Sequence, residues 1–270
     1  MKFLPQLYRE SQTDWFGKRG ISWHISVVYR RSKGVLQSQA FIHVIQTCTQ
    51  GSSAVVALIQ HVIQTLRNEH PEILRCFLYQ DNAGCYHSNN TILACPAIEK
   101  STGIKVQGMD FCDPQGGKGA ADRMAATAKN HIRIFINEGN DVTTAQQMKD
   151  ALLSHGGIKG VRVAAADQLK EISIEQPKIQ GISKLNNFWF DEKGKLAALR
   201  AYNIGKGRNI NVNTSTDKYQ WLQDVSFSPG DFKDHAAKST ARIGATDQQR
   251  AEPQAPQASL PSSSSYVIPL

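Results

Sequence analysis

Two apolar patterns alternate along the first 112 residues of the chain. Short runs of β-branched and aromatic residues are typical of strands, whereas apolar residues that recur every three or four positions are typical of amphipathic helices. The strand pattern occurs on both sides of the turn at 32–34, which predicts a β-hairpin. The predicted elements are strands at 21–30, 39–45, 76–80 and 105–112, and helices at 52–68 and 88–100, the last kinked or divided by Pro96.

The same alternation continues in the second half of the chain. Thr144 and Gln147 have the spacing of a capping box, in which two side chains satisfy the backbone at the start of a helix. The predicted elements are a helix at 120–138, a helix from 144 through 153, a strand at 161–165, and a hairpin formed by 185–190 and 196–204.

This order of elements predicts an α/β fold with a C-terminal hairpin extension and a disordered tail. Residues 240–270 are rich in Ala, Gln, Pro and Ser, so they cannot bury enough surface to order themselves. We therefore expect a main domain at 1–166, an extension carrying the hairpin at 167–239, and the tail at 240–270.

The charge of the chain narrows the class of partner. A net charge of +8 and a sequence pI of about 9.3 indicate an anionic partner, either nucleic acid or an acidic membrane surface. No apolar run has the length of a membrane span, and residues 1–5 lack the apolar core of a signal peptide. Five singly placed cysteines indicate a reducing compartment. We interpret the protein as intracellular, without a membrane partner.

Two stretches carry the candidate chemistry. Asp81 follows a predicted strand within 80–87, and Asp122 lies in the first turn of the predicted helix that follows the glycine-rich stretch 113–122. Two carboxylates brought together in this way form most of a two-metal site that cuts or joins phosphodiester bonds. Taken singly, each has an ordinary interpretation: the first stretch as a turn, and Asp122 as a helix N-terminal charge.

Other catalytic sites fit the sequence less well. The Gly-Gly-Lys-Gly stretch lacks the Gly-Lys-Ser/Thr ending of a nucleotide-binding loop, which disfavours mononucleotide hydrolysis. Cys85, His87 and Cys112 match no common zinc module, so we interpret the cysteines as ordinary buried thiols. The histidines are too dispersed for a catalytic triad, and only His87 is close enough to a candidate acid to support it.

The order of the elements and the residues of the two motifs resemble those of the catalytic domain of acid-triad transposases and retroviral integrases. Asp-Asn-Ala-Gly at 81–84 is similar to the second-acid motif of that superfamily with one inserted residue, and Pro114 followed by Gly-Ala-Ala-Asp at 119–122 is similar to the third-acid motif. The two acids are 41 positions apart. More narrowly, residues 1–202 resemble animal proteins derived from mobile elements.

The resemblance implies a ribonuclease-H-like mixed sheet flanked by helices, and metal-dependent cleavage or strand transfer on DNA in the nucleus. It implies that Asp81 and Asp122 bind two Mg²⁺ or Mn²⁺ ions. Four residues would contact the nucleic acid or order the site: Asn82, Lys118, Lys129 and Arg133.

The first acid of the resembled triad has no clear counterpart. In the resembled fold this acid lies on the first strand. Residues 1–4 would be the end of that strand, which puts the expected acid just upstream of Met1, so we interpret the chain as truncated at its N-terminus. Asp14 is the substitute within the chain, with Glu10 as a weaker one. The alternatives are a decayed element, a nucleic-acid-binding protein without catalysis, and a protein-interaction module; self-association is compatible with each.

Overall fold

Strands and helices alternate in the computed structural model as the apolar pattern predicts, and the α/β fold class is confirmed. The structure describes residues 1–8, 20–112, 119–170, 172–191, 194–202, 204–210, 218–235 and 267–269. The strands are β1 (Lys2–Phe3), β2 (Ile21–Ser32), β3 (Val35–Cys48), β4 (Arg75–Gln80), β5 (Lys105–Phe111), β6 (Val161–Leu169), β7 (Asn187–Phe190), β8 (Leu196–Leu199), β9 (Arg208–Ile210), β10 (Lys233–His235) and β11 (Val267–Pro269). The helices are α2 (Ser52–Glu69), α3 (Asn89–Leu93), α4 (Cys95–Thr102), α5 (Ala120–Asn137) and α6 (Ala145–Leu153), with short 3-10 turns η1 (Ser154–Gly156) and η2 (Ile182–Lys184).

The hairpin of β2 and β3 is the longest pair in the sheet. It is antiparallel and pairs without interruption from Ser22 opposite Ile45 to Ser32 opposite Val35. The two-residue turn between the strands has positive φ at Lys33 (48°) and at Gly34 (80°). Positive φ at both central positions matches the right-handed twist of a hairpin, so the turn sets the register of both strands.

The sheet is mixed, as expected for the predicted fold. Its order is β10-β3-β2-β11-β4-β5-β7-β8-β9, with β1 paired to β2 and β6 paired to β3. β4 is parallel to β5 and to β11, and β3 is parallel to β6, whereas the other pairs are antiparallel. The C-terminal hairpin, β7 and β8, is hydrogen-bonded to β5 and therefore extends the same sheet.

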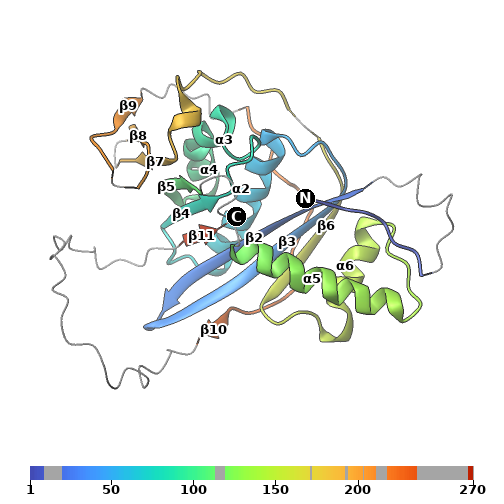
Figure 1. Ribbon diagram of the computed structural model, residues 1–270. Helices are drawn as coiled ribbons and strands as arrows, with labels where there is room; N and C mark the ends of the chain where they lie inside the picture. The colour runs from blue at the N-terminus through green and yellow to red at the C-terminus, as the bar shows by residue number, and fades with distance from the viewer. Residues whose placement is uncertain are drawn as a thin grey trace, which may run out of the picture.

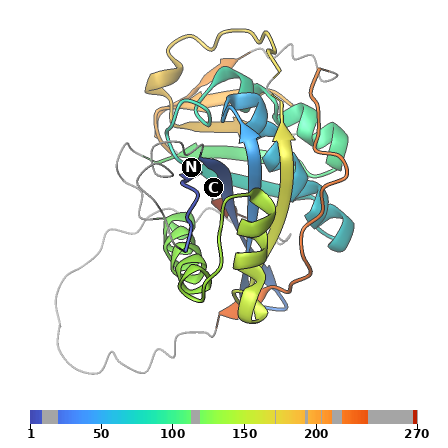
Figure 2. The same cartoon turned by 90° about the vertical axis from the view of Figure 1, so that its right-hand side faces the viewer.

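Helices cover both faces of the sheet. Trp23, Ile25 and Val27 of β2 pack with α5 and α6 on one face, and Val28 packs with α2, α3 and α4 on the other. Figure 1 shows α5 and α6 together beside the hairpin, with α2, α3 and α4 gathered on its other side; Figure 2 shows the same arrangement after a quarter turn. Because side chains alternate along a strand, His24 and Ser26 face the α2 side.

Both ends of the chain lie in the middle of the sheet. Phe3 of β1 pairs with Ile21, and Val267 of β11 pairs with Tyr29, so both short strands run antiparallel to β2 along the edge that faces β4. The place between β2 and β4 is therefore occupied by a strand of three residues, β11, which is parallel to β4.

Several element predictions are refined by the structure. Pro96 begins a second helix, because α3 ends at Leu93 and α4 starts at Cys95. The N-cap of α2 is Gly51, because the Ser52 hydroxyl accepts from Asn90 and the Ser53 hydroxyl from the Ile172 backbone. Of the predicted tail, residues 240–266 and 270 lie outside the described residues, and the other three form β11. No helix in the described ranges has the length and apolar character needed to cross a membrane.

Candidate active site at the ends of β4 and α5

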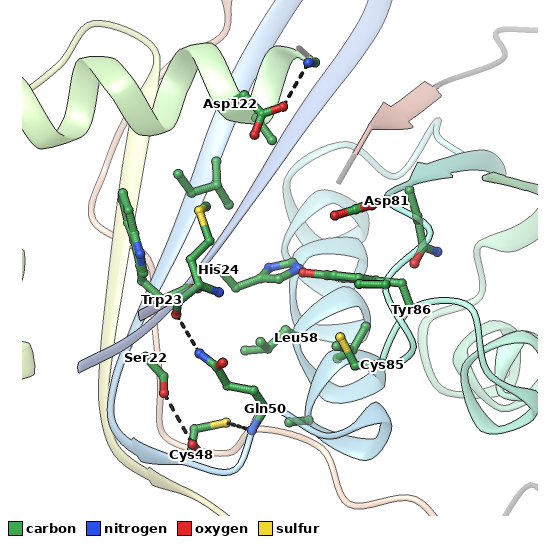
Figure 3. Close-up of a pocket in the computed structure, with 18 of the residues that line it drawn as sticks. Ser22, Trp23, His24, Cys48, Gln50, Leu58, Asp81, Cys85, Tyr86 and Asp122 are labelled. Carbon is green, nitrogen blue, oxygen red and sulfur yellow. Dashed lines mark hydrogen bonds between the residues drawn. The ribbon is translucent and has the colours of Figure 1, made fainter. Parts of the chain in front are cut away.

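A cavity of about 490 Å³ opens between β2, the end of β4, the start of α2 and the start of α5. Apolar side chains, among them Ile25, Val55 and Leu58, form part of its wall. The polar groups that line it come from the loop after β4 and from the first turn of α5 (Figure 3). The cavity is therefore bordered by both of the stretches that the sequence singled out.

Asp81 is the first residue after β4 and lines this cavity. The Cys112 backbone N–H donates to the Gln80 carbonyl at 3.1 Å, so β4 and the end of β5 stay joined up to the point where Asp81 leaves the sheet. The residue is exposed. No side chain or backbone group in the described ranges is hydrogen-bonded to its carboxylate.

Asp122 lines the same cavity from the first turn of α5. Its Oδ2 accepts a hydrogen bond from the Gly119 backbone N–H at 3.0 Å. This contact satisfies one of the free backbone donors at the start of the helix, as the ordinary interpretation of an acid there requires. No other hydrogen bond reaches this carboxylate from the described part of the chain, so capping the helix and binding a cation are compatible roles.

The structure thus brings together two acids that are 41 positions apart in the sequence. In Figure 3, Asp81 and Asp122 enter the cavity from opposite sides, and the rings of His24 and Tyr86 lie between them and the wall formed by Leu58. The two acids lie in one cavity because β4 delivers the first at its carboxyl end and α5 begins beside that end.

Two of the other predicted site residues, Lys129 and Arg133, are absent from the described residues that line this cavity. Lys129 and Arg133 are exposed on α5, about two and about three turns beyond Asp122. The Lys129 Nζ lies 6.0 Å from the centroid of the Trp23 ring, and Arg133 donates to the Asn130 side chain at 2.8 Å. Asp14 and Lys118, and the weaker substitute Glu10, lie outside the described residues.

Asn82 differs in position from its neighbour Asp81. Its side-chain amide is hydrogen-bonded to Nδ1 of His87, and Asn82 is absent from the described residues that line the cavity. The amide therefore orders the loop after β4 rather than reaching the space between the two acids.

Two cavity residues were not singled out by the sequence. His24 is buried, and neither ring nitrogen has a hydrogen-bond partner in the described part of the chain. Burial lowers the pKa of His24 to about 3, so the ring is neutral. Its centroid is 5.9 Å from that of Tyr86, whose pKa is raised by burial. The strand alternation that places His24 on the α2 face was the available signal, but it does not indicate a cavity.

The cysteines at this cavity are thiols. Cys48, Cys85 and Cys112 line it, and burial raises the pKa of Cys85 above its ordinary value. A protonated thiol is a poor metal ligand and a poor nucleophile. The interpretation as buried thiols fits Cys48, Cys76 and Cys95, whereas Cys85 and Cys112 are half-buried.

The donor set fits a hard cation incompletely. Carboxylate oxygens are the ligands that Mg²⁺ and Mn²⁺ prefer, and two of them border the cavity. Across the described ranges, no group of three or more His, Cys, Asp or Glu side chains is placed to hold a metal ion. A site for two ions would therefore need a further acid besides Asp81 and Asp122.

Comparison with known proteins yields one match. A family model described as "Domain of unknown function (DUF8701)" matches residues 3–197, which is more than half of the chain and includes both acids. No curated protein and no solved structure matches the chain significantly.

Proposed function

We propose that this protein, which belongs to the family described as Domain of unknown function (DUF8701), acts on DNA by metal-dependent cleavage or strand transfer of phosphodiester bonds. One observation carries the proposal: Asp81 and Asp122, each at the end of a different element, line the same cavity. The motifs at 81–84 and 119–122, which resemble those of transposases and integrases, support it independently.

The two carboxylates would divide the work of holding one divalent cation. The Asp81 carboxylate has no hydrogen bond in the described ranges and would bind the cation directly. Asp122 would contribute a second carboxylate oxygen while keeping its hydrogen bond to the Gly119 N–H. A cation held there would polarise a phosphodiester oxygen and lower the pKa of bound water. The rings of His24 and Tyr86, which form part of the cavity wall, would reduce the space for water beside the cation.

The charge of the molecule supports DNA as the partner. Lys129 and Arg133 are exposed on the helix that begins beside the cavity, and they are four positions apart, so they lie on one face of it. Together with the net charge of +8, they would bind the phosphate backbone on one side of the cleaved bond. A DNA substrate also implies a nuclear location.

Cleavage of labelled DNA tests the proposal. The purified protein is incubated with supercoiled plasmid in Mg²⁺, Mn²⁺ or EDTA, and nicked product is measured for the native chain, Asp81→Asn and Asp122→Asn. We expect nicking that requires the metal and falls at least a hundredfold in each variant. Metal-dependent nicking that both variants retain in full would exclude the assigned site.

A second candidate is a DNA-binding protein without catalysis. It is favoured by the number of acids, because Asp81 and Asp122 are the only carboxylates among the described residues that line the cavity. This candidate predicts salt-sensitive DNA binding by the native chain, unchanged by EDTA and by either Asp→Asn substitution, with no nicking at any metal concentration.

A further inference from the structure

The loop that carries Asp81 is folded back on itself. The backbone N–H groups of Tyr86 and His87 both donate to the Ala83 carbonyl at 2.9 Å. Immediately afterwards the Ser88 side chain caps α3 by accepting from the Thr91 N–H at 3.1 Å. The loop is therefore fixed at both ends, by β4 and by α3, and His87 lies at the closing point of its turn.

His87 joins this loop to a distant part of the chain. Its Nε2 lies 2.9 Å from the Leu185 carbonyl oxygen, 98 positions away, and its Nδ1 contacts the Asn82 side-chain amide. A carbonyl oxygen can only accept, so Nε2 carries a proton. The Asn82 atom that faces Nδ1 is Oδ1, so a ring protonated at both nitrogens donates to both partners as they lie. A neutral ring keeps the link when the Asn82 amide turns over and presents its nitrogen to Nδ1.

The ring is also held by packing. It stacks on Phe111, the last residue of β5, with centroids 4.3 Å apart and planes at 26°. The Phe111 N–H in turn donates to the Asn186 carbonyl at 2.8 Å, beside the Leu185 carbonyl that accepts from the ring. His87 thus lies where the loop after β4, the end of β5 and the start of β7 meet. Burial lowers its pKa, and hydrogen bonds to the Leu185 and Ile182 carbonyls oppose that change.

We propose that His87 is the positioning residue of the Asp81 carboxylate, which it holds through Asn82. This role of His87 rests on the proposed function, in which Asp81 binds the metal ion. Asp81 makes no hydrogen bond of its own within the described ranges, so its place depends on its neighbour Asn82, whose amide is fixed by the ring. Partners that orient metal-binding side chains in this way commonly change metal affinity by ten- to a hundredfold when they are removed.

Substitution of the ring separates its bonds from its packing. His87→Phe keeps an aromatic ring against Phe111 and removes both hydrogen bonds, and His87→Gln keeps a side chain that can make one of them. His131→Phe is the matched control, since Nε2 of His131 also lies 3.0 Å from a backbone carbonyl, that of Ser154 on another part of the fold. The three variants are compared with the native full-length chain.

The first measurement is amide hydrogen exchange at positions 86 and 87, whose N–H groups close the turn on Ala83. We expect exchange about tenfold faster in His87→Phe, an intermediate rate in His87→Gln, and no change in His131→Phe. Nitrogen NMR of the native ring is expected to show Nε2 protonated. Unchanged exchange in both variants at position 87, or a ring with its proton on Nδ1 alone, would overturn the proposal whatever the function is.

The second measurement is Mn²⁺ affinity, followed by broadening of the Asp81 amide resonance. We expect binding at least about tenfold weaker in His87→Phe, partly restored in His87→Gln and unchanged in His131→Phe. Equal Mn²⁺ affinity in the native chain and His87→Phe, with faster exchange at positions 86 and 87, would contradict a positioning role. Absence of Mn²⁺ binding in the native chain would instead overturn the proposed function and, with it, the role of His87 at a metal.

Discussion

At the scale of single residues, three buried histidines lie in a row, and the first of them, His24, lines the cavity. The ring centroids of His24 and His43 are 6.2 Å apart, those of His43 and His61 are 5.1 Å apart, and Nε2 of His43 lies 2.9 Å from Nδ1 of His61. Burial lowers the pKa of each, that of His24 to about 3. The row is therefore a neutral part of the core.

The buried histidines predict a loss of stability in acid. Below about pH 6.5 the unfolded chain binds a proton at His24, whereas the native ring does not bind one until about pH 3, so the free energy of unfolding falls as the pH falls through this window. Between pH 6.5 and 5 His24 alone contributes a loss of about 2 kcal/mol. Urea unfolding at pH 7.5 and pH 5 measures it.

His24→Leu is the test variant for this prediction. It removes a titrating group whose two nitrogens have no partner in the described part of the chain, so its stability at pH 7.5 should equal or exceed that of the native protein. Its loss of stability between pH 7.5 and pH 5 should be smaller by about 2 kcal/mol. An identical pH dependence in the two proteins would contradict the assignment of His24 as a buried neutral ring.

Some residues of the site could be predicted from the sequence, and others could not. Asp81 and Asp122 were identified because each occupies a position, after a strand and inside the first turn of a helix, that local pattern defines. The hydrogen bond between Asn82 and His87 was not predictable, because it depends on a loop that closes over six residues and on the carbonyl of Leu185, 98 positions from the ring. The role assigned to Asn82 at the nucleic acid remains a prediction.

At the scale of elements, helix ends were predicted best where side chains satisfy the backbone locally. The Thr144 hydroxyl accepts from the Gln147 N–H at 3.1 Å, and Oε1 of Gln147 accepts from the Thr144 N–H at 3.1 Å, which is the predicted capping box. No side chain caps α2, whose N-cap is Gly51, since the hydroxyls of Ser52 and Ser53 are bound by groups from distant segments. A local rule held where no tertiary partner competed for the side chain.

Removal of the capping box should destabilise α6. Thr144→Ala loses the side-chain acceptor for the Gln147 N–H, and we expect the free energy of unfolding to fall by about 1 kcal/mol. Thr127→Ala is the control, because Thr127 is exposed within α5 and alanine has a higher helix propensity. Urea unfolding measures both; an equal loss in the two variants would show that the cap has no special contribution.

At the scale of the whole molecule, the sheet contains pairings that local pattern could not indicate. β6 joins β3 in parallel, β7 joins β5, and the centre between β2 and β4 is occupied by β11, which is more than 180 positions from β4 in sequence. Such long-range pairing depends on the register of side chains across the sheet, which the sequence of one strand does not encode. The α/β class and the first hairpin were predictable because alternation and turn chemistry are local.

The basic face of α5 predicts the salt dependence of DNA binding. If Lys129 and Arg133 each contact a phosphate, replacing either with alanine should reduce the slope of log K against log salt concentration by about one. Lys195→Ala, at an exposed position on the β7–β8 hairpin, is the control and should leave the slope unchanged. Fluorescence anisotropy between 50 and 200 mM salt, a range of the order used for such slopes, measures it; slopes unaffected by both α5 substitutions would place the DNA elsewhere.

The central claim is that Asp81 and Asp122 form one metal site, and Mn²⁺ titration of four proteins tests it most directly. The native chain, Asp81→Asn, Asp122→Asn and the double variant are compared by calorimetry; asparagine at 122 can still accept from the Gly119 N–H and so preserves the start of α5. We predict that either single substitution removes most of the binding free energy and that the double substitution adds little, because both act on the same ion. Losses that add independently, or Mn²⁺ binding that survives both substitutions, would contradict a shared site.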